Sequence, residues 1–68
     1  MAERRLGNNL KELRTAKGLT QADLAVLVGV SRKTVNTVEN GVFVPSTVLA
    51  LALAHALDAT VEEIFFLN

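Results

Sequence analysis

Between Ser31 and Asn40 the sequence gathers side chains that can bind a polar partner by hydrogen bonds or positive charge. On a helical wheel, Val35 and Val38 mark the buried side of this segment. The opposite side carries Lys33, Asn36, Thr37 and Asn40, with Arg32 in the exposed first turn. In DNA recognition, Arg or Lys binds guanine, Asn binds adenine, and Thr binds a thymine methyl group or a phosphate. Each residue alone also fits an ordinary solvated helix face, so the interpretation depends on the surrounding elements.

Other kinds of site chemistry are excluded by composition. The chain has no cysteine, which removes thiol catalysis, disulfides and thiolate metal sites, and its single histidine, His55, cannot build an imidazole-rich metal site. Glu62 and Glu63 are adjacent, but acids are favoured in the first turn of a helix without any catalytic role. We find no nucleophile with a base and no glycine loop for phosphate. We therefore expect no enzyme activity, no metal or other cofactor, and no small-molecule substrate.

Length and hydropathy predict one small globular domain spanning residues 1–68. Half of the 68 residues are hydrophobic, which excludes disorder, but a chain this short buries only about 60% of its extended surface. It must therefore rely on tight helix packing, on a partner, or on both. No apolar run reaches the roughly 18 residues of a membrane span, and the N-terminus has no apolar export signal. We expect a cytoplasmic protein that does not bind membranes.

Charge is unevenly distributed along the chain. The formal net charge is zero, which by itself argues against nucleic-acid binding. However, residues 1–40 hold every Lys and Arg and carry +3, whereas residues 41–68 carry −3. The two halves are therefore expected to face different partners.

The polar group lies within a predicted all-α fold, a compact bundle of five short helices without strands. The helices span residues 3–17, 21–28, 32–40, 47–57 and 61–65. Their boundaries follow from capping residues and glycines, and from Pro45 in the loop before the fourth helix. Thr20 with Asp23, and Thr60 with Glu63, have the spacing of capping boxes.

The second and third helices are expected to form a helix-turn-helix unit. Leu24 and Val28 give the second helix an apolar face, and the small Ala25 allows a close helix crossing. Gly29 permits a tight turn, after which Val35 and Val38 seat the third helix on the core. Two helices held nearly perpendicular leave the outer face of the third exposed, and such a helix fits the DNA major groove.

Taken in order, these pieces resemble the phage-repressor and Cro-like helix-turn-helix transcriptional regulators, also described as xenobiotic-response-element-type. The segments that carry the resemblance are Leu19 to Ala25, Gly29 to Val35, Glu39 to Gly41, Pro45 with Ser46, and Glu62 to Phe65. The resemblance covers nearly the whole chain and implies a lambda-repressor-like fold with the third helix in the major groove.

The resemblance also implies roles for individual residues. Gln21 matches a phosphate-clamping glutamine at a helix N-terminus, where backbone N–H groups also favour an anion. Base contacts are expected from Ser31, Arg32, Lys33 and Thr37, to which the helical wheel adds Asn36, and backbone phosphate contacts are expected from Thr34 and Asn40. Arg14 and Glu39 match a pair that ties the first helix to the third, and Arg14 is also a candidate phosphate contact. As an exposed pair they would add only ~0–1 kcal/mol, so we expect them to set register.

Two features depart from the family pattern. The loop after the third helix is uncharged, Val42-Phe43-Val44, which should weaken phosphate binding. The fourth helix is apolar on all sides, so part of it must be buried by another protein. With Ala50, Leu53, Ala54 and Leu57 in the core, its outer face holds Val48, Leu51, Ala52 and His55. Together with Phe43, Phe66 and Leu67, this face is our predicted homodimer interface.

We therefore predict a small dimeric transcriptional regulator that binds a pseudo-palindromic site on double-stranded DNA. The alternative is a protein-interaction module, such as an antitoxin or co-regulator, that keeps the same fold and binds a partner through its apolar C-terminal half. Zero net charge and the uncharged loop favour the alternative, whereas Gln21, Arg32, Lys33 and Asn40 in register favour DNA. The exposed apolar residues could also be scattered ones without a role.

Overall fold

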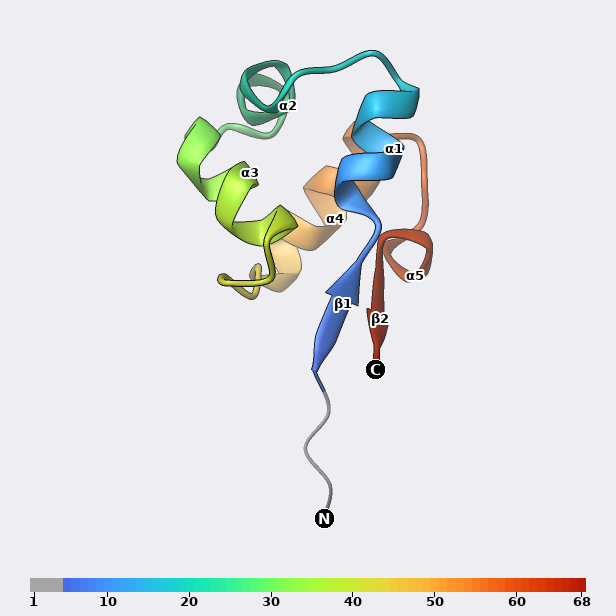
Figure 1. The fold of residues 1–68 in the computed structure, drawn as a ribbon. Coiled ribbons are helices and arrows are strands. Elements are labelled where there is room, and N and C mark those ends of the chain that lie inside the picture. The colour runs from blue at the N-terminus through green and yellow to red at the C-terminus, as the bar shows by residue number, and fades with distance from the viewer. Residues whose placement is uncertain (1–4) are drawn as a thin grey trace.

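The computed structural model describes residues 5–68 and shows a mostly helical domain closed by a small sheet (Figure 1). The elements in chain order are β1 (Leu6–Asn8), α1 (Leu10–Ala16), α2 (Gln21–Val28), α3 (Arg32–Glu39), α4 (Thr47–Ala56), α5 (Val61–Ile64) and β2 (Phe65–Leu67). Residues 5–68 contain five helices, the number predicted. The expected start of the first helix at residue 3 lies outside the described residues.

The prediction of a fold without strands is wrong. β1 pairs antiparallel with β2, with Leu6 opposite Leu67 and Gly7 opposite Phe66 (Figure 1). The side chain of Asn8 accepts a hydrogen bond of 3.0 Å from the backbone N–H of Leu10, so α1 begins there, later than predicted. The last helix also ends one residue early, because Phe65 is already extended.

The predicted starts of α2, α3, α4 and α5 are confirmed by their capping bonds. Thr20 with Asp23, and Thr60 with Glu63, form complete capping boxes in which each side chain bonds the other residue's backbone N–H. Ser31 and Ser46 accept from the backbone N–H groups three residues on. Gly29 has φ of 74°, a left-handed conformation that lets the chain turn sharply between α2 and α3.

One hydrophobic core joins all five helices. Its buried members are Leu10, Leu24, Ala25, Val35, Val38, Leu53, Ala54, Leu57, Ile64 and Phe65. The predicted buried sides of α2, α3 and α4 are confirmed by this set, except that Val28 and Ala50 are half-buried and pack against its edge. Among residues 5–68, no helix is long and apolar enough to cross a membrane.

Candidate nucleic-acid interface

Helix α3 lies against the core by one narrow side and is open on the other. Val35 and Val38, exposed by only 1% and 2%, are its buried residues. Asn8 of β1 donates a 3.0 Å hydrogen bond to the carbonyl oxygen of Val38, which ties the end of α3 to the sheet. Helix α3 is thus fixed to the core and the sheet on its buried side, while its outer face stays accessible.

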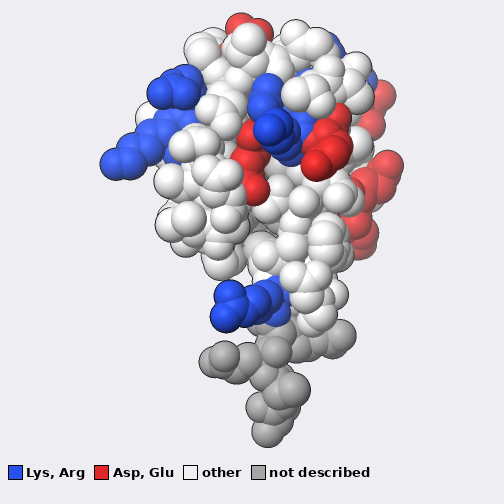
Figure 2. All heavy atoms as spheres, in the orientation of Figure 1, with Lys and Arg blue, Asp and Glu red and all other residues white. Residues whose placement is uncertain are grey.

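The predicted base-contacting residues lie together on this outer face. Ser31, Arg32 and Lys33 are exposed, and Asn36 and Thr37 are half-buried. Basic side chains project from the left edge of the molecule beside α3 and acidic ones line the right edge, while side chains of both signs lie in the centre of this view (Figure 2). The uneven charge of the sequence is therefore also uneven in space.

The hydroxyl groups at the start of α3 serve the helix itself. Ser31 Oγ accepts from the Thr34 backbone N–H at 3.1 Å and shares a 3.0 Å hydrogen bond with Thr34 Oγ1. Thr37 Oγ1 donates to the Thr34 carbonyl oxygen at 2.9 Å. The groups that can still contact a ligand are the methyl group of Thr37 and the unused lone pairs of these hydroxyls.

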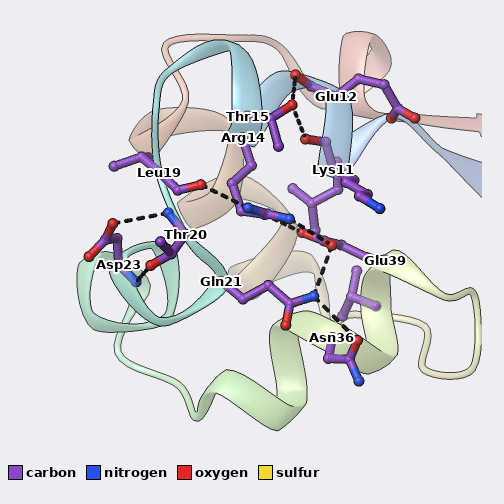
Figure 3. Close-up of polar contacts among 12 residues, drawn as sticks. Lys11, Glu12, Arg14, Thr15, Leu19, Thr20, Gln21, Asp23, Asn36 and Glu39 are labelled. Atoms are coloured by element: carbon purple, nitrogen blue, oxygen red, sulfur yellow. Dashed lines mark hydrogen bonds and ion pairs between the residues drawn. The ribbon is translucent and has the colours of Figure 1, made fainter.

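Arg14 and Glu39 form an ion pair between α1 and α3 (Figure 3). Arg14 Nε lies 2.6 Å from Glu39 Oε2, and a further guanidinium nitrogen donates to the Leu19 carbonyl oxygen at 2.7 Å. The hydrogen bond to Glu39 raises the pKa of Arg14. The side chains are only 9% and 3% exposed, so the expectation of an exposed pair with a small energy is wrong. Both charges are desolvated, and removing either one would leave the other buried without a counter-charge.

Gln21 connects this pair to the exposed face of α3 (Figure 3). Its Nε2 donates to Glu39 Oε1 at 3.0 Å and to Asn36 Oδ1 at 3.2 Å. Its Oε1 accepts from Arg32 at 3.4 Å, and Asn40 Nδ2 donates to Asn36 Oδ1 at 3.1 Å. Sequence reasoning named all of these residues but missed that they form one network, because the contacts join different helices.

The N-terminus of α2 carries one acidic side chain beside Gln21. Hydrogen bonds from Thr20, first of all from its backbone N–H, lower the pKa of Asp23. The capping box uses the N–H of Asp23, whereas the first N–H groups of a helix have no intrahelical partner. The N–H groups of Gln21 and Ala22 therefore remain as donors at this end of α2.

The predicted interface residues lie mostly at the surface. Phe43, Val48, Leu51, Phe66 and Leu67 are 46%, 79%, 57%, 42% and 58% exposed, His55 is exposed, and Ala52 is half-buried. Sequence reasoning missed other exposed apolar side chains, namely Val26, Leu27 and Val44. The exposure of Val26 and Leu27 could not be predicted from the sequence, because both faces of α2 are apolar.

A shallow apolar groove of about 580 Å³ borders α4. It is lined by Leu6, Pro45, Thr47, Ala50, Leu51, Val61, Glu62 and Phe65. Leu51 therefore belongs both to the groove and to the predicted interface. Among the described residues, no group of three His, Cys, Asp or Glu side chains is placed to hold a metal ion.

With this geometry in place, comparison with known proteins identifies the class. The helix-turn-helix domain family matches residues 5–65, and the chain belongs to this family of DNA-binding transcriptional regulators. It is 43% identical over 61 residues to the HTH-type transcriptional regulator YgzD of Bacillus subtilis, covering 90% of this chain and 92% of that protein. The HTH-type regulator MJ0272 of Methanocaldococcus jannaschii is 43% identical over 58 residues, covering 85% and 88%.

Solved structures agree with this assignment. The restriction-modification controller protein C.AhdI of Aeromonas hydrophila superposes with a TM-score of 0.75 and 52% identity, covering 79% of this chain and 82% of that one. The clp gene regulator ClgR of Corynebacterium glutamicum also gives 0.75, at 33% identity over 79% and 57% of the two chains. The resemblance seen in the sequence is thereby confirmed at the level of family and overall fold.

Proposed function

We propose that this chain is a sequence-specific transcriptional regulator, a single domain that binds duplex DNA as a homodimer with α3 in the major groove. The observation that carries the proposal is α3 itself, fixed to the core by Val35 and Val38 with a polar and cationic outer face. A helix presented in this way can reach base edges, which is how sequence is read directly.

Base contacts are assigned to the outer face of α3 and phosphate contacts to its margins. Ser31, Arg32, Lys33, Asn36 and Thr37 make up the first group. Thr34, Asn40 and the start of α2 at Gln21 make up the second. Both side-chain N–H groups of Gln21 are engaged with Asn36 and Glu39, so a phosphate at this point would be held by backbone N–H groups.

Arg14 is assigned a positioning role rather than a phosphate contact. It is only 7% exposed, and its guanidinium donates to Glu39 and to the Leu19 carbonyl oxygen. A phosphate would have to displace a buried counter-charge to reach it, which costs more than an ordinary surface contact provides. The pair instead fixes α3 relative to α1.

The homodimer is proposed to form through Phe43, Val48, Leu51, Ala52, His55, Phe66 and Leu67, with the groove beside Leu51 as a recess for the partner's apolar side chains. A core of this size is marginal alone, and self-association would cover apolar surface. Two-fold symmetry would place two copies of α3 roughly 34–36 Å apart, one DNA turn, and would require a pseudo-palindromic site.

DNA binding is tested by measuring affinity for mixed duplex DNA at two salt concentrations, followed by selection from a random duplex pool. Release of counterions from phosphates makes affinity fall steeply with salt, so we expect a clear decrease. Selection should return a pseudo-palindrome. An absent or salt-independent response would refute DNA binding.

The dimer is tested by sedimentation of the parent and of Val48→Glu. We expect a dimer at high micromolar concentration and a monomer after the substitution. Val26→Glu is the matched control, because Val26 is equally exposed on α2, at 81% against 79% for Val48, and is outside the proposed interface. A parent that sediments as a monomer refutes the dimer.

The second candidate is a protein-interaction module with the same fold. The apolar surface of its C-terminal half, on a chain of zero net charge, favours it. This candidate predicts an absent or flat salt response in the duplex assay, together with loss of heterologous partner binding in Val48→Glu.

A further inference from the structure

Five side chains form one continuous chain of hydrogen bonds, from the interior to the exposed face of α3, and Figure 3 shows the part from Arg14 to Asn36. The chain runs from Arg14 of α1 to Glu39, then to Gln21 at the start of α2, then to Asn36 and Asn40 at the end of α3. Its inner end is buried and charged, and its outer end lies where the DNA is proposed to bind.

The charged inner end determines which way each amide group points. Arg14 can only donate, and the ionised carboxylate of Glu39 can only accept. Gln21 must therefore turn its NH2 group toward Glu39, because its carbonyl oxygen would meet a negative charge. The second N–H of the same group reaches Asn36, which must accept it through Oδ1.

Asn36 Oδ1 also accepts from Asn40 Nδ2, at 3.1 Å beside the 3.2 Å bond from Gln21. Both lone pairs of this oxygen are thus used inside the protein. We infer that Asn36 offers DNA a group that only donates hydrogen bonds, and that Gln21 is the positioning residue that enforces this. The inference rests on the proposed function for the location of the DNA.

The consequence concerns which DNA atoms Asn36 can bind. Asparagine reads adenine by using its oxygen and its NH2 group together. Asn36 cannot do so without breaking two internal hydrogen bonds. Its NH2 group suits an acceptor, which is the N7 of guanine or adenine, guanine O6, thymine O4, or a phosphate oxygen. This differs from the adenine contact expected from residue type.

The first test compares the parent with Asn36→Ala on duplexes that carry single base changes in the parent's selected site. We expect about a tenfold loss of affinity. A loss confined to duplexes with guanine or thymine at one position supports a base contact, and an equal loss on every duplex supports a phosphate contact. A parent preference for adenine over guanine at the position sensitive to residue 36, or no loss at all, overturns the inference.

The second test releases Asn36 by Gln21→Met, which is similar in size but donates no hydrogen bond. For a base contact, adenine should become tolerated at the position sensitive to residue 36. For a phosphate contact, affinity should fall on every duplex. In either case the variant should cause no further change in an Asn36→Ala background. Val26→Met, at an exposed position of α2 outside the network and the proposed phosphate contact, is the control. An unchanged binding profile in Gln21→Met overturns the role of Gln21.

A measurement without DNA separates failure of this inference from failure of the proposed function. The side-chain NH2 signals of Asn36 in nuclear magnetic resonance spectra should shift in Gln21→Met and stay in place in Val26→Met. Unchanged signals in both variants overturn the inference. If the parent binds no duplex DNA, the proposed function fails, while the signals still decide whether Gln21 orients Asn36.

Discussion

The ring of Phe66 in β2 lies directly over Gly7 in β1. A Cβ atom on Gly7 would stand 2.6 Å from Cζ of that ring, closer than any real contact allows. The two residues are paired in the strand register, and the glycine leaves the room that the ring occupies. Phe66 nevertheless stays 42% exposed, so it contributes both to the sheet and to the proposed dimer interface.

Gly7→Ala should therefore lower the free energy of unfolding, by about 1–3 kcal/mol, because the added methyl group overpacks the strand pair. Urea denaturation measures this loss. In a Phe66→Leu background the same substitution should cost less, since the smaller side chain can yield. If Gly7→Ala lowers the free energy of unfolding equally in both backgrounds, overpacking against the Phe66 ring is not the cause of the loss.

Glu39→Leu should cost about 3–5 kcal/mol of stability, because it leaves the Arg14 guanidinium buried without a counter-charge. Arg14→Leu combined with Glu39→Leu should cost less than the sum of the single changes. The raised pKa of Arg14 keeps its contribution fully present at every pH below the ordinary pKa of arginine. Urea titrations between about pH 6 and 9 should therefore show no pH dependence from Arg14. If the double variant loses as much stability as the two single variants together, Arg14 and Glu39 are not energetically coupled.

Val35→Asp should unfold the domain rather than only prevent DNA binding, because an unpaired carboxylate in the core costs on the order of the whole stability of a small domain. Val26→Asp is the control on the same helix-turn-helix unit, since Val26 is 81% exposed and Val35 only 1%. Circular dichroism on heating should show a cooperative transition for Val26→Asp and none for Val35→Asp. A transition near the parent's in Val35→Asp would contradict the observed core.

The lowered pKa of Asp23 makes the capping of α2 depend on pH. A carboxyl group whose pKa falls on folding stabilises fully above its ordinary value of 3.8 and loses this effect as the pH drops through the lower folded value. The parent should therefore exceed Asp23→Asn in stability by more at pH 7 than at about pH 3. Urea denaturation at the two pH values measures the difference, and equal differences would rule out this linkage.

Arg32→Ala and Lys33→Ala should each cost about 1–3 kcal/mol of binding to the selected site and relax the preference for particular bases. Lys17→Ala removes the same charge from the exposed end of α1 and should leave base preference unchanged. Competition between duplexes with single base changes provides the measurement. Parent-like affinity in both α3 variants would refute the assignment of base contacts.

Local chemistry explains how much of the fold was predictable. The capping pairs at Thr20 and Thr60 and the turn at Gly29 are encoded within a few residues, and all three are found where predicted. β1 was missed because its partner strand is at the other end of the sequence, and three residues give no periodicity.

The candidate site was predictable in its members more than in its connections. The wheel through Val35 and Val38 located the outer face of α3, and family resemblance suggested Arg14 with Glu39. Burial of that pair and the bonds of Gln21 depend on how three helices pack, which no single segment encodes.

The antiparallel pairing of β1 with β2 also determines how the molecule would respond to mechanical force. Both strands meet the rest of the chain at the Asn8 and Phe65 end and diverge at the Leu6 and Leu67 end, where Asn68 donates a 2.8 Å hydrogen bond to the Arg5 carbonyl oxygen. Tension between the two ends of the chain would act on these hydrogen bonds one after another, starting at the Leu6 and Leu67 end, rather than on all of them together. The sheet should therefore open at low force, and the helices around Leu24 and Val35 would resist only afterwards.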